Sequence, residues 1–168
     1  MFRHCYPPAE PAVSFCSILR SLLQRDDDFC GVLKEYLGVE YCVLGNSGRA
    51  LLCRLLIVLK RNLGGEKNRV LIPGYTCYSV AASVARAGLE ISCYDLDPST
   101  LFPDMDSVHA MAGRNTLAIV GQHLFGIPTP MEELKVVAHE VGASFIEDAA
   151  HGLGGIFQGK KLGTMGDF

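Results

Sequence analysis

The chain has 168 residues, with 15 Lys and Arg against 18 Asp and Glu and a formal net charge of -3. This length suits one domain, and a composition of 49% hydrophobic and 20% charged residues excludes an intrinsically disordered chain. The mixed, slightly acidic charge argues against a nucleic-acid or membrane partner, and Arg54 interrupts the apolar run from Ala50 to Leu59. The first residues also lack the order of a secretory signal.

The sequence holds 7 cysteines. An odd number without any C-x-x-C pair argues against both a disulfide framework and a zinc site. We therefore predict buried, reduced thiols in a cytoplasmic protein.

The first part of the chain predicts an arm followed by two helices. Residues 1–13 contain Pro7, Pro8 and Pro11 and are typical of an arm. Helical spacing of apolar residues predicts a helix from Ser14 to Gln24. Asp26, Asp27 and Asp28 then supply capping carboxylates for a second helix that ends at Gly38, so we interpret this acidic triplet as a cap and not a metal site.

From residue 39 onward the pattern alternates between strands and helices. The expected strands are Val39–Leu44, Arg69–Pro73, Glu90–Leu96, Thr116–Gln122 and Ala143–Glu147. The expected helices are Arg49–Leu63, Tyr78–Ala87, Asp104–Met111 and Met131–Val141. This alternation predicts an α/β fold with a mostly parallel sheet flanked by helices, whose ligands bind beyond the carboxyl ends of the strands.

Several segments follow these strand ends. Gly45 to Gly48 opens a helix and suits either a phosphate cradle or an ordinary turn. Asp148 ends an apolar strand before two alanines, so its carboxylate either pairs with a cationic ring nitrogen or caps the next turn, while Glu147 faces the other side of the strand. The rings of Pro73–Ser79 either stack on a planar ligand or pack against a helix, and His123 either contacts a ligand or shapes a turn.

Taken together, these segments resemble the DegT/DnrJ/EryC1/StrS family of pyridoxal-phosphate sugar aminotransferases, which have fold type I. The resemblance runs from about Gly38 to Phe168 and follows the order of the family's motifs. Asn46–Leu51 is similar to its S-G-T-x-A-L turn, and Ile146–His151 is similar to I-E-D-A-A-Q/H. Gly159–Gly163 is similar to G-K-x-x-G, in a hairpin-like segment.

The resemblance implies a role for the two ends of the cofactor, pyridoxal 5'-phosphate. Asp148 would hold the pyridinium nitrogen, and His151 would lie near the ring hydroxyl. Ser47, Gly48 and Arg49 would bind the phosphate, with Arg49 standing where the family has Thr.

The position that stacks on the cofactor ring corresponds to Cys77, where many family members carry an aromatic residue. Tyr78 or Tyr75 is the alternative.

In this family the Schiff-base lysine follows a glycine-aspartate motif, so it would lie beyond Phe168; Lys160 and Lys161 belong to the hairpin-like segment instead. The resemblance therefore implies that residues 14–168 are the N-terminal part of the cofactor-binding domain, without the small C-terminal domain, and that this chain is inactive alone.

For the full-length protein, the resemblance implies transfer of an amino group from glutamate or glutamine to a keto group, expected on a nucleotide-linked sugar, by a homodimer. Three alternatives stay open: a dehydratase of the same family with His in place of the lysine, a non-catalytic truncated relative, and an α/β interaction domain.

Overall fold

The computed structural model describes residues 14–23 and 28–168. The chain divides into two compact units, Met1–Val43 and Leu44–Phe168. The expected arm, 1–13, and the first two aspartates of the acidic triplet lie outside the described residues. None of the helices in the described ranges is long and apolar enough to cross a membrane.

The described part of the first unit holds the helices α1 (Phe15–Leu23) and α2 (Phe29–Leu37). Asp28 caps α2, because its side chain accepts a hydrogen bond of 2.8 Å from the backbone N–H of Gly31. Gly38 ends the helix with φ 76°, a left-handed conformation that glycine adopts without strain. The predicted cap and helix end are therefore confirmed.

The prediction of a strand over Val39–Leu44 is wrong, because these residues take no regular secondary structure. Their apolar side chains at Tyr41, Val43 and Leu44 are exposed. Alternating hydrophobicity predicts a strand only where a neighbouring strand supplies hydrogen bonds, and a single sequence does not reveal that neighbour.

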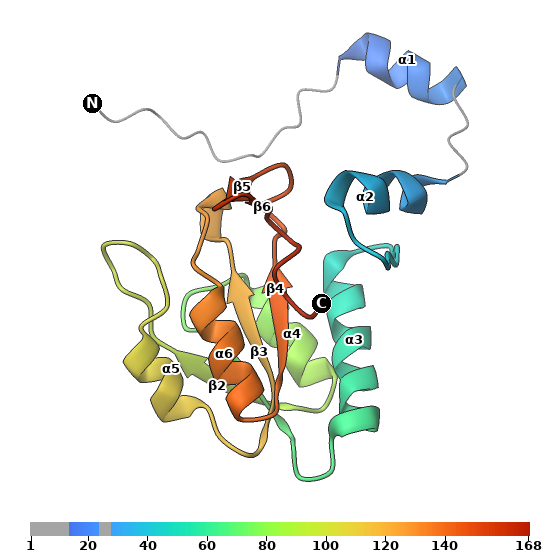
Figure 1. Cartoon of the computed structure of the whole chain (residues 1–168). Helices are drawn as coiled ribbons and strands as arrows, with labels where there is room; N and C mark the ends of the chain where they lie inside the picture. The colour runs from blue at the N-terminus through green and yellow to red at the C-terminus, as the bar shows by residue number, and fades with distance from the viewer. Residues whose placement is uncertain (1–13, 24–27) are drawn as a thin grey trace. The chain divides into compact units, whose positions relative to one another are not determined.

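The second unit is built on a four-stranded parallel sheet with the order β2-β1-β3-β4 (Figure 1). The strands are β1 (Arg69–Pro73), β2 (Glu90–Tyr94), β3 (Thr116–Gln122) and β4 (Ser144–Asp148). Parallel strands need crossover connections, and helices supply them here. The predicted α/β class is confirmed.

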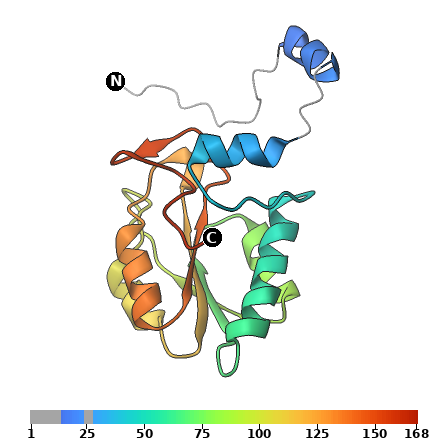
Figure 2. The same cartoon turned by 45° about the vertical axis from the view of Figure 1, so that its right-hand side comes forward.

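Helices cover both faces of this sheet, as Figure 2 shows. On one face, α3 (Gly48–Leu63) and α4 (Tyr78–Arg86) pack on strand residues such as Val70 and Ile72. On the other face, α5 (Met105–Met111) and α6 (Glu132–Glu140) pack on the alternate residues, among them Leu71. The strands β1, β3 and β4 are thus buried on both sides, which explains their apolar runs, whereas the edge strand β2 is largely exposed.

A short two-stranded hairpin follows β4. The short strands β5 (Ile156–Phe157) and β6 (Lys160–Lys161) form an antiparallel pair, which confirms the hairpin-like character expected for the two lysines. A single 3-10 turn, η1 (Leu124–Gly126), follows β3.

The amino-terminal edge of the sheet is held by Lys67. Its ammonium donates to the carbonyl of Thr116, at 3.1 Å, and to the carbonyl of Val141, at 2.8 Å. The first of these residues begins β3, and the second follows α6. One side chain therefore joins a strand to the helix that packs on it.

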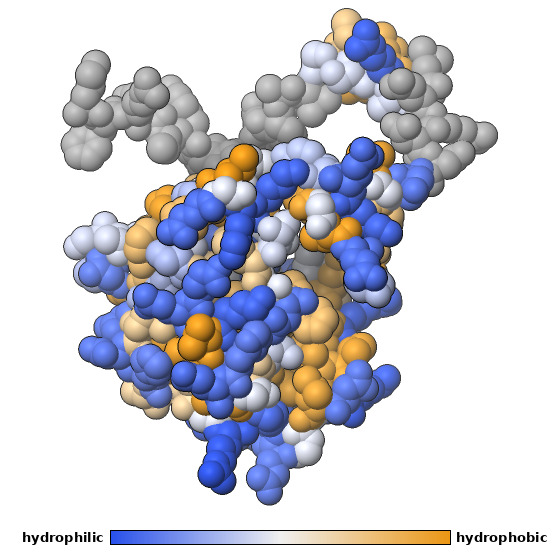
Figure 3. Space-filling view, viewed as in Figure 1, coloured by the Kyte–Doolittle hydropathy of each residue, from blue (hydrophilic) through white to orange (hydrophobic). Residues whose placement is uncertain are grey.

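Apolar side chains also lie on the outer side of α3, where Figure 3 shows a hydrophobic area. Two apolar residues of α3, Val58 and Leu63, are about half exposed. Exposed apolar surface of this kind is typical of an interaction face.

The cysteines are only partly as predicted. All six described cysteines are free thiols, but only Cys53 is buried. Cys77 precedes α4 as its N-cap, and Cys93 lies on the edge strand β2, and both are exposed. An apolar run does not distinguish a core position from a position at an edge or at a helix end.

Candidate cofactor site

Three polar side chains form a row across the carboxyl ends of β1, β3 and β4. Gln122 ends β3 and lies in register with Asp148 at the end of β4. Thr76, which follows β1, donates its hydroxyl to the side-chain oxygen of Gln122. The sheet order β1-β3-β4 therefore gathers these groups at the edge where ligands of parallel sheets bind.

Asp148 takes the capping role, one of the two alternatives that its sequence context allows. One carboxylate oxygen accepts the backbone N–H of Ala150 at 3.1 Å, so the residue caps the turn after β4. This leaves acceptor capacity on the carboxylate for a ligand, since an ionised carboxylate has about four lone-pair sites. The side chain is half-buried, and Ala149 and Ala150 present little bulk beside it.

The turn before α3 is a capped helix N-terminus with free backbone N–H groups. Ser47 is its N-cap, and its hydroxyl accepts the N–H of Ala50 at 3.2 Å. The first intrahelical bond runs from Leu51 N–H to the Ser47 carbonyl, so the N–H groups of Gly48 and Arg49 precede the helical ladder. A helix of 16 residues adds its dipole to these donors.

Arg49 adds a positively charged side chain to this turn. Its guanidinium lies 3.3 Å from the Tyr78 hydroxyl, which joins the start of α3 to the start of α4. Tyr78 is 74% exposed, so its ring does not pack into the helix layer. Tyr75, the other candidate ring, lies 6.4 Å from the ring of Phe125 between centroids, on the loop after β3.

The thiol of Cys77 is influenced by the charges of both Arg49 and Asp148. Hydrogen bonds from the hydroxyl and the backbone of Ser79 lower the pKa of its thiol, the first of them 3.0 Å long. The negative charge of Asp148 raises the pKa of the same thiol, and the positive charge of Arg49 lowers it. The thiol is thus within electrostatic reach of both groups.

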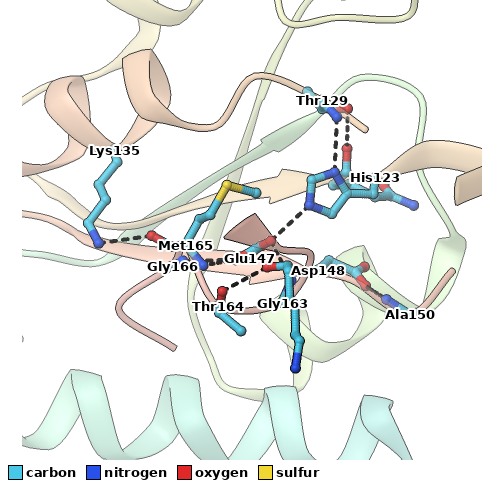
Figure 4. A network of polar contacts seen from close by, with 12 residues as sticks. His123, Thr129, Lys135, Glu147, Asp148, Ala150, Gly163, Thr164, Met165 and Gly166 are labelled. Atoms are coloured by element: carbon cyan, nitrogen blue, oxygen red, sulfur yellow. Dashed lines mark hydrogen bonds and ion pairs between the residues drawn. The ribbon is translucent and has the colours of Figure 1, made fainter. Parts of the chain in front are cut away.

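Behind this edge, Glu147 is the centre of a buried network (Figure 4). Its side chain is only 1% exposed and accepts backbone N–H groups of Gly163 and Met165 at 2.6 Å and of Gly166 at 2.9 Å. Burial alone would raise the pKa of Glu147, but hydrogen bonds from His123 and from these three amides outweigh it and hold the pKa below its usual value. The carboxylate therefore fixes the segment after β6.

Gly166 shows how closely this segment approaches β4. A Cβ atom at this position would lie 2.9 Å from the Cβ of Glu147 and 2.5 Å from the carbonyl oxygen of Phe168. Only glycine fits there without displacing backbone.

Of the two alternatives for His123, contact with a ligand or a structural role in the turn, the structure shows the structural role. It is 0% exposed, and its Nδ1 accepts the backbone N–H of Thr129 at 3.0 Å. The ring proton therefore resides on Nε2, which donates to Glu147 at 2.8 Å. His123 thus connects the loop after β3 to the Glu147 network.

Asp167 holds the same C-terminal segment from a second side. Its Oδ2 accepts the backbone N–H of Phe145 at 2.8 Å, and the ammonium of Lys135 lies 3.4 Å from its Oδ1. His139 contacts the same carboxylate at 3.0 Å although its side chain is 52% exposed.

His151 lies in the turn after β4, and its imidazole is exposed. Its carbonyl lies against Gly126, where an added Cβ would come within 2.9 Å of the His151 oxygen. This turn and the loop after β3 are therefore neighbours.

The structure brings the predicted residues Arg49 and Tyr78 into contact, and the charges of Arg49 and Asp148 both act on the Cys77 thiol. The sequence reading did not single out Thr76, Ser79 or Gln122. A polar residue at the end of each apolar strand is the signal that identifies Gln122. The hydrogen bond from Ser79 to Cys77 depends on the helix start and carries no separate sequence signal.

Comparison with known proteins gives one family. The model of the DegT/DnrJ/EryC1/StrS aminotransferase family matches residues 19–168.

Two relatives are similar in sequence. An L-glutamine:2-deoxy-scyllo-inosose aminotransferase from Streptomyces kanamyceticus is 35% identical over 147 residues, which is 88% of this chain and 34% of the relative. A GDP-perosamine synthase from Caulobacter vibrioides is 31% identical over 140 residues, 83% of this chain and 37% of the relative. The chain thus spans about a third of the length of the curated relatives it matches.

Solved structures share the fold. AtS13 from Actinomadura melliaura matches with a TM-score of 0.82 and 27% identity, over 97% of this chain and 48% of that chain. DesI, solved in the presence of its TDP-sugar product, matches with a TM-score of 0.73 and 31% identity, over 84% and 35% of the two chains. A GDP-4-keto-6-deoxymannose-3-dehydratase, at 22% identity and a TM-score of 0.72, shares the fold.

Proposed function

We infer, since the chain belongs to the DegT/DnrJ/EryC1/StrS aminotransferase family, that the complete protein transfers an amino group to a keto group on a nucleotide-linked sugar. Enzymes of this family depend on pyridoxal phosphate. The single observation that carries the proposal is the position of Asp148, which ends β4 at the carboxyl edge of the sheet and keeps acceptor capacity beyond its bond to Ala150.

The residues at this edge suit the two charged ends of the cofactor. A phosphate matches the amides of Gly48 and Arg49, the helix dipole of α3 and the guanidinium of Arg49. A ring nitrogen matches Asp148, and the small side chains after Asp148 leave room for a flat ring. The bound cofactor supplies an electron sink for the carbon that gains or loses the amino group.

We assign the remaining residues roles that their contacts support. Asp148 keeps a proton on the ring nitrogen, and its bond to Ala150 fixes the carboxylate that does so. Ser47 holds the start of α3 in place through its cap. We place Cys77 against the face of the ring, with Tyr78 bound to Arg49 beside the phosphate, and His151 at the ring hydroxyl.

The substrate class is drawn from the relatives. One relative is named as a GDP-perosamine synthase, and the DesI structure was solved with its TDP-sugar product. Another relative is named for L-glutamine and 2-deoxy-scyllo-inosose. We propose glutamine or glutamate as the amino donor and a homodimer as the assembly of the full-length protein. The apolar outer side of α3 supports an interface.

Titration of the chain with pyridoxal phosphate, followed by absorbance and by cysteine protection, tests the cofactor part of this proposal. We expect saturable binding that is at least about tenfold weaker in Asp148→Asn and in Arg49→Ala, a loss of about 1.4 kcal/mol for each. Asp106→Asn, an exposed carboxylate in the first turn of α5, is the matched control and should bind normally. Equal binding in all variants would contradict the site.

The reaction requires the full-length protein. Amino transfer from glutamine to a keto sugar nucleotide, measured by mass spectrometry of the product, tests the substrate class. Transfer to free sugars or cyclic ketones only would contradict the nucleotide-linked substrate while leaving the cofactor site unaffected.

A further inference from the structure

Two cysteines of the first unit lie in direct contact. Cys30 is in the first turn of α2, and Cys42 follows the helix in the segment after Gly38. The Cys30 sulfur lies 3.9 Å from the backbone carbonyl oxygen of Cys42, and the two thiol groups interact with each other. Both are half-buried free thiols.

We propose that Cys30 and Cys42 form a dithiol site that closes to a disulfide when it reacts with a small-molecule disulfide such as glutathione disulfide. The site is separate from the residues assigned to the cofactor and does not depend on the proposed function. It differs from the other described cysteines, since Cys16, Cys77 and Cys93 are exposed and Cys53 is buried in the core.

The surroundings of Cys42 assign the first attack to Cys30 and the second, resolving attack to Cys42. Burial and the neighbouring Cys30 thiol raise the pKa of Cys42, and the positive charge of Lys34 offsets this only in part. The raised pKa makes Cys42 the poorer first nucleophile. Cys30 attacks first.

The chemistry balances in two exchanges. The Cys30 thiolate forms a bond to one sulfur of glutathione disulfide, the glutathione sulfur–sulfur bond breaks, and one glutathione leaves as its thiolate. Cys42 then loses its proton to water and attacks the Cys30 sulfur, and the second glutathione leaves. Two protein thiols are oxidised, and one glutathione disulfide is reduced to two thiols.

Closure would tie the first turn of α2 to the segment that follows the helix. Gly38 already turns the chain back at the end of α2, which lets Cys42 reach Cys30 without unwinding the helix. The disulfide would therefore restrict residues 39–41, which lie between that turn and Cys42 and have no regular secondary structure.

Trypsin makes this testable, because Lys34 separates the two cysteines. The 168-residue chain is equilibrated with reduced and oxidised glutathione, remaining thiols are alkylated, and the digest is analysed by mass spectrometry. Cleavage after Arg25, Lys34 and Arg49 yields peptides 26–34 and 35–49, each with one cysteine. We expect a linked pair of these peptides, two hydrogens lighter than their sum, at least about tenfold more abundant than any other linked pair.

Two controls separate native geometry from simple proximity in sequence. In concentrated urea the excess of this pair should fall, since the contact is lost. In Cys30→Ser, glutathione should accumulate on Cys42 or that thiol should stay reduced, whereas Cys16→Ser should leave the linked pair unchanged. Separate glutathione adducts on Cys30 and Cys42 of the folded wild-type chain, without a linked pair, would overturn the proposal.

Discussion

Glu147 and Asp148 are consecutive residues of β4, yet their carboxylates lie on opposite sides of the strand with different partners. Glu147 accepts hydrogen bonds from His123 and from three backbone amides, whereas Asp148 accepts the Ala150 amide. Alternation along a strand explains the opposite directions. The carboxylate of Glu147 is fully occupied by hydrogen bonds within the protein, whereas that of Asp148 can still accept hydrogen bonds from a ligand.

Neutralising these two carboxylates should therefore have different effects. Asp148→Asn should lower the affinity for pyridoxal phosphate at least about tenfold and change the free energy of unfolding by less than about 1 kcal/mol. Glu147→Gln places amide hydrogens against backbone donors and should cost about 3 kcal/mol of stability, because hydrogen bonds to charged groups contribute about 1.5–3 kcal/mol each. Urea denaturation and cofactor titration measure the two quantities.

The comparison is informative because each substitution removes one negative charge and keeps the shape. If Asp148→Asn lost stability and Glu147→Gln did not, the assignment of the two faces would be wrong.

Arg49 should contribute mainly to phosphate binding. In Arg49→Ala, pyridoxal phosphate should bind about tenfold more weakly, about 1.4 kcal/mol, while pyridoxal without the phosphate should bind unchanged. Tyr78→Phe removes only a hydroxyl that contacts Arg49 and should have a smaller effect of about twofold to threefold. Arg54→Ala, an exposed position on the same helix, serves as control. A loss shared equally by both ligands would contradict a phosphate role.

Cys77 should react with alkylating agents at lower pH than an ordinary thiol. The hydroxyl of Ser79 stabilises the thiolate, so Ser79→Ala should move the pH profile of Cys77 alkylation to higher pH. Quantitative mass spectrometry of the peptide with Cys77 gives the rate at each pH, and pyridoxal phosphate should slow it if the ring covers the thiol. An unchanged profile in Ser79→Ala would show that the hydrogen bond is not formed in solution.

The segment from Gly163 to Phe168 should detach first in acid. The pKa of Glu147 and the pKa of Asp167 are both lowered in the fold: burial opposes this, but hydrogen bonds to each carboxylate outweigh it. Their contribution to stability is thus complete above the unfolded values of about 4.3 and 3.9, and is lost as pH falls through the lower folded values.

Hydrogen exchange of the Gly163, Met165 and Gly166 amides as a function of pH measures this detachment. Amides of β3 should remain protected at pH values where these three begin to exchange. Simultaneous loss of protection in both regions would show that the segment does not open separately.

The sequence predicts most of the second unit because its signals are local. The apolar runs of β1 and β3 and the helix of residues 105–111 were expected within two residues of their observed bounds, since each is bordered by a turn or a cap. The segment from Val39 to Leu44 failed because strand formation depends on a distant partner.

Contacts at the site are harder to predict. Arg49 and Tyr78 are separated by 29 positions, and Thr76 and Gln122 by 46, so their meeting depends on strand order and register. The residue types were visible as polar groups at strand ends, but their pairing was not.

The position of Lys67 has a practical consequence for engineering. Its ammonium binds the carbonyl of Thr116 where β3 begins, while the same strand ends in Gln122, in register with Asp148, which we assign to the cofactor. The contacts of Lys67 and the proposed cofactor site thus lie at opposite ends of one strand. A mutant library restricted to the loops after β1, β3 and β4 can therefore vary what the protein recognises without loosening this clamp, and heat tolerance and selectivity can be improved in separate rounds.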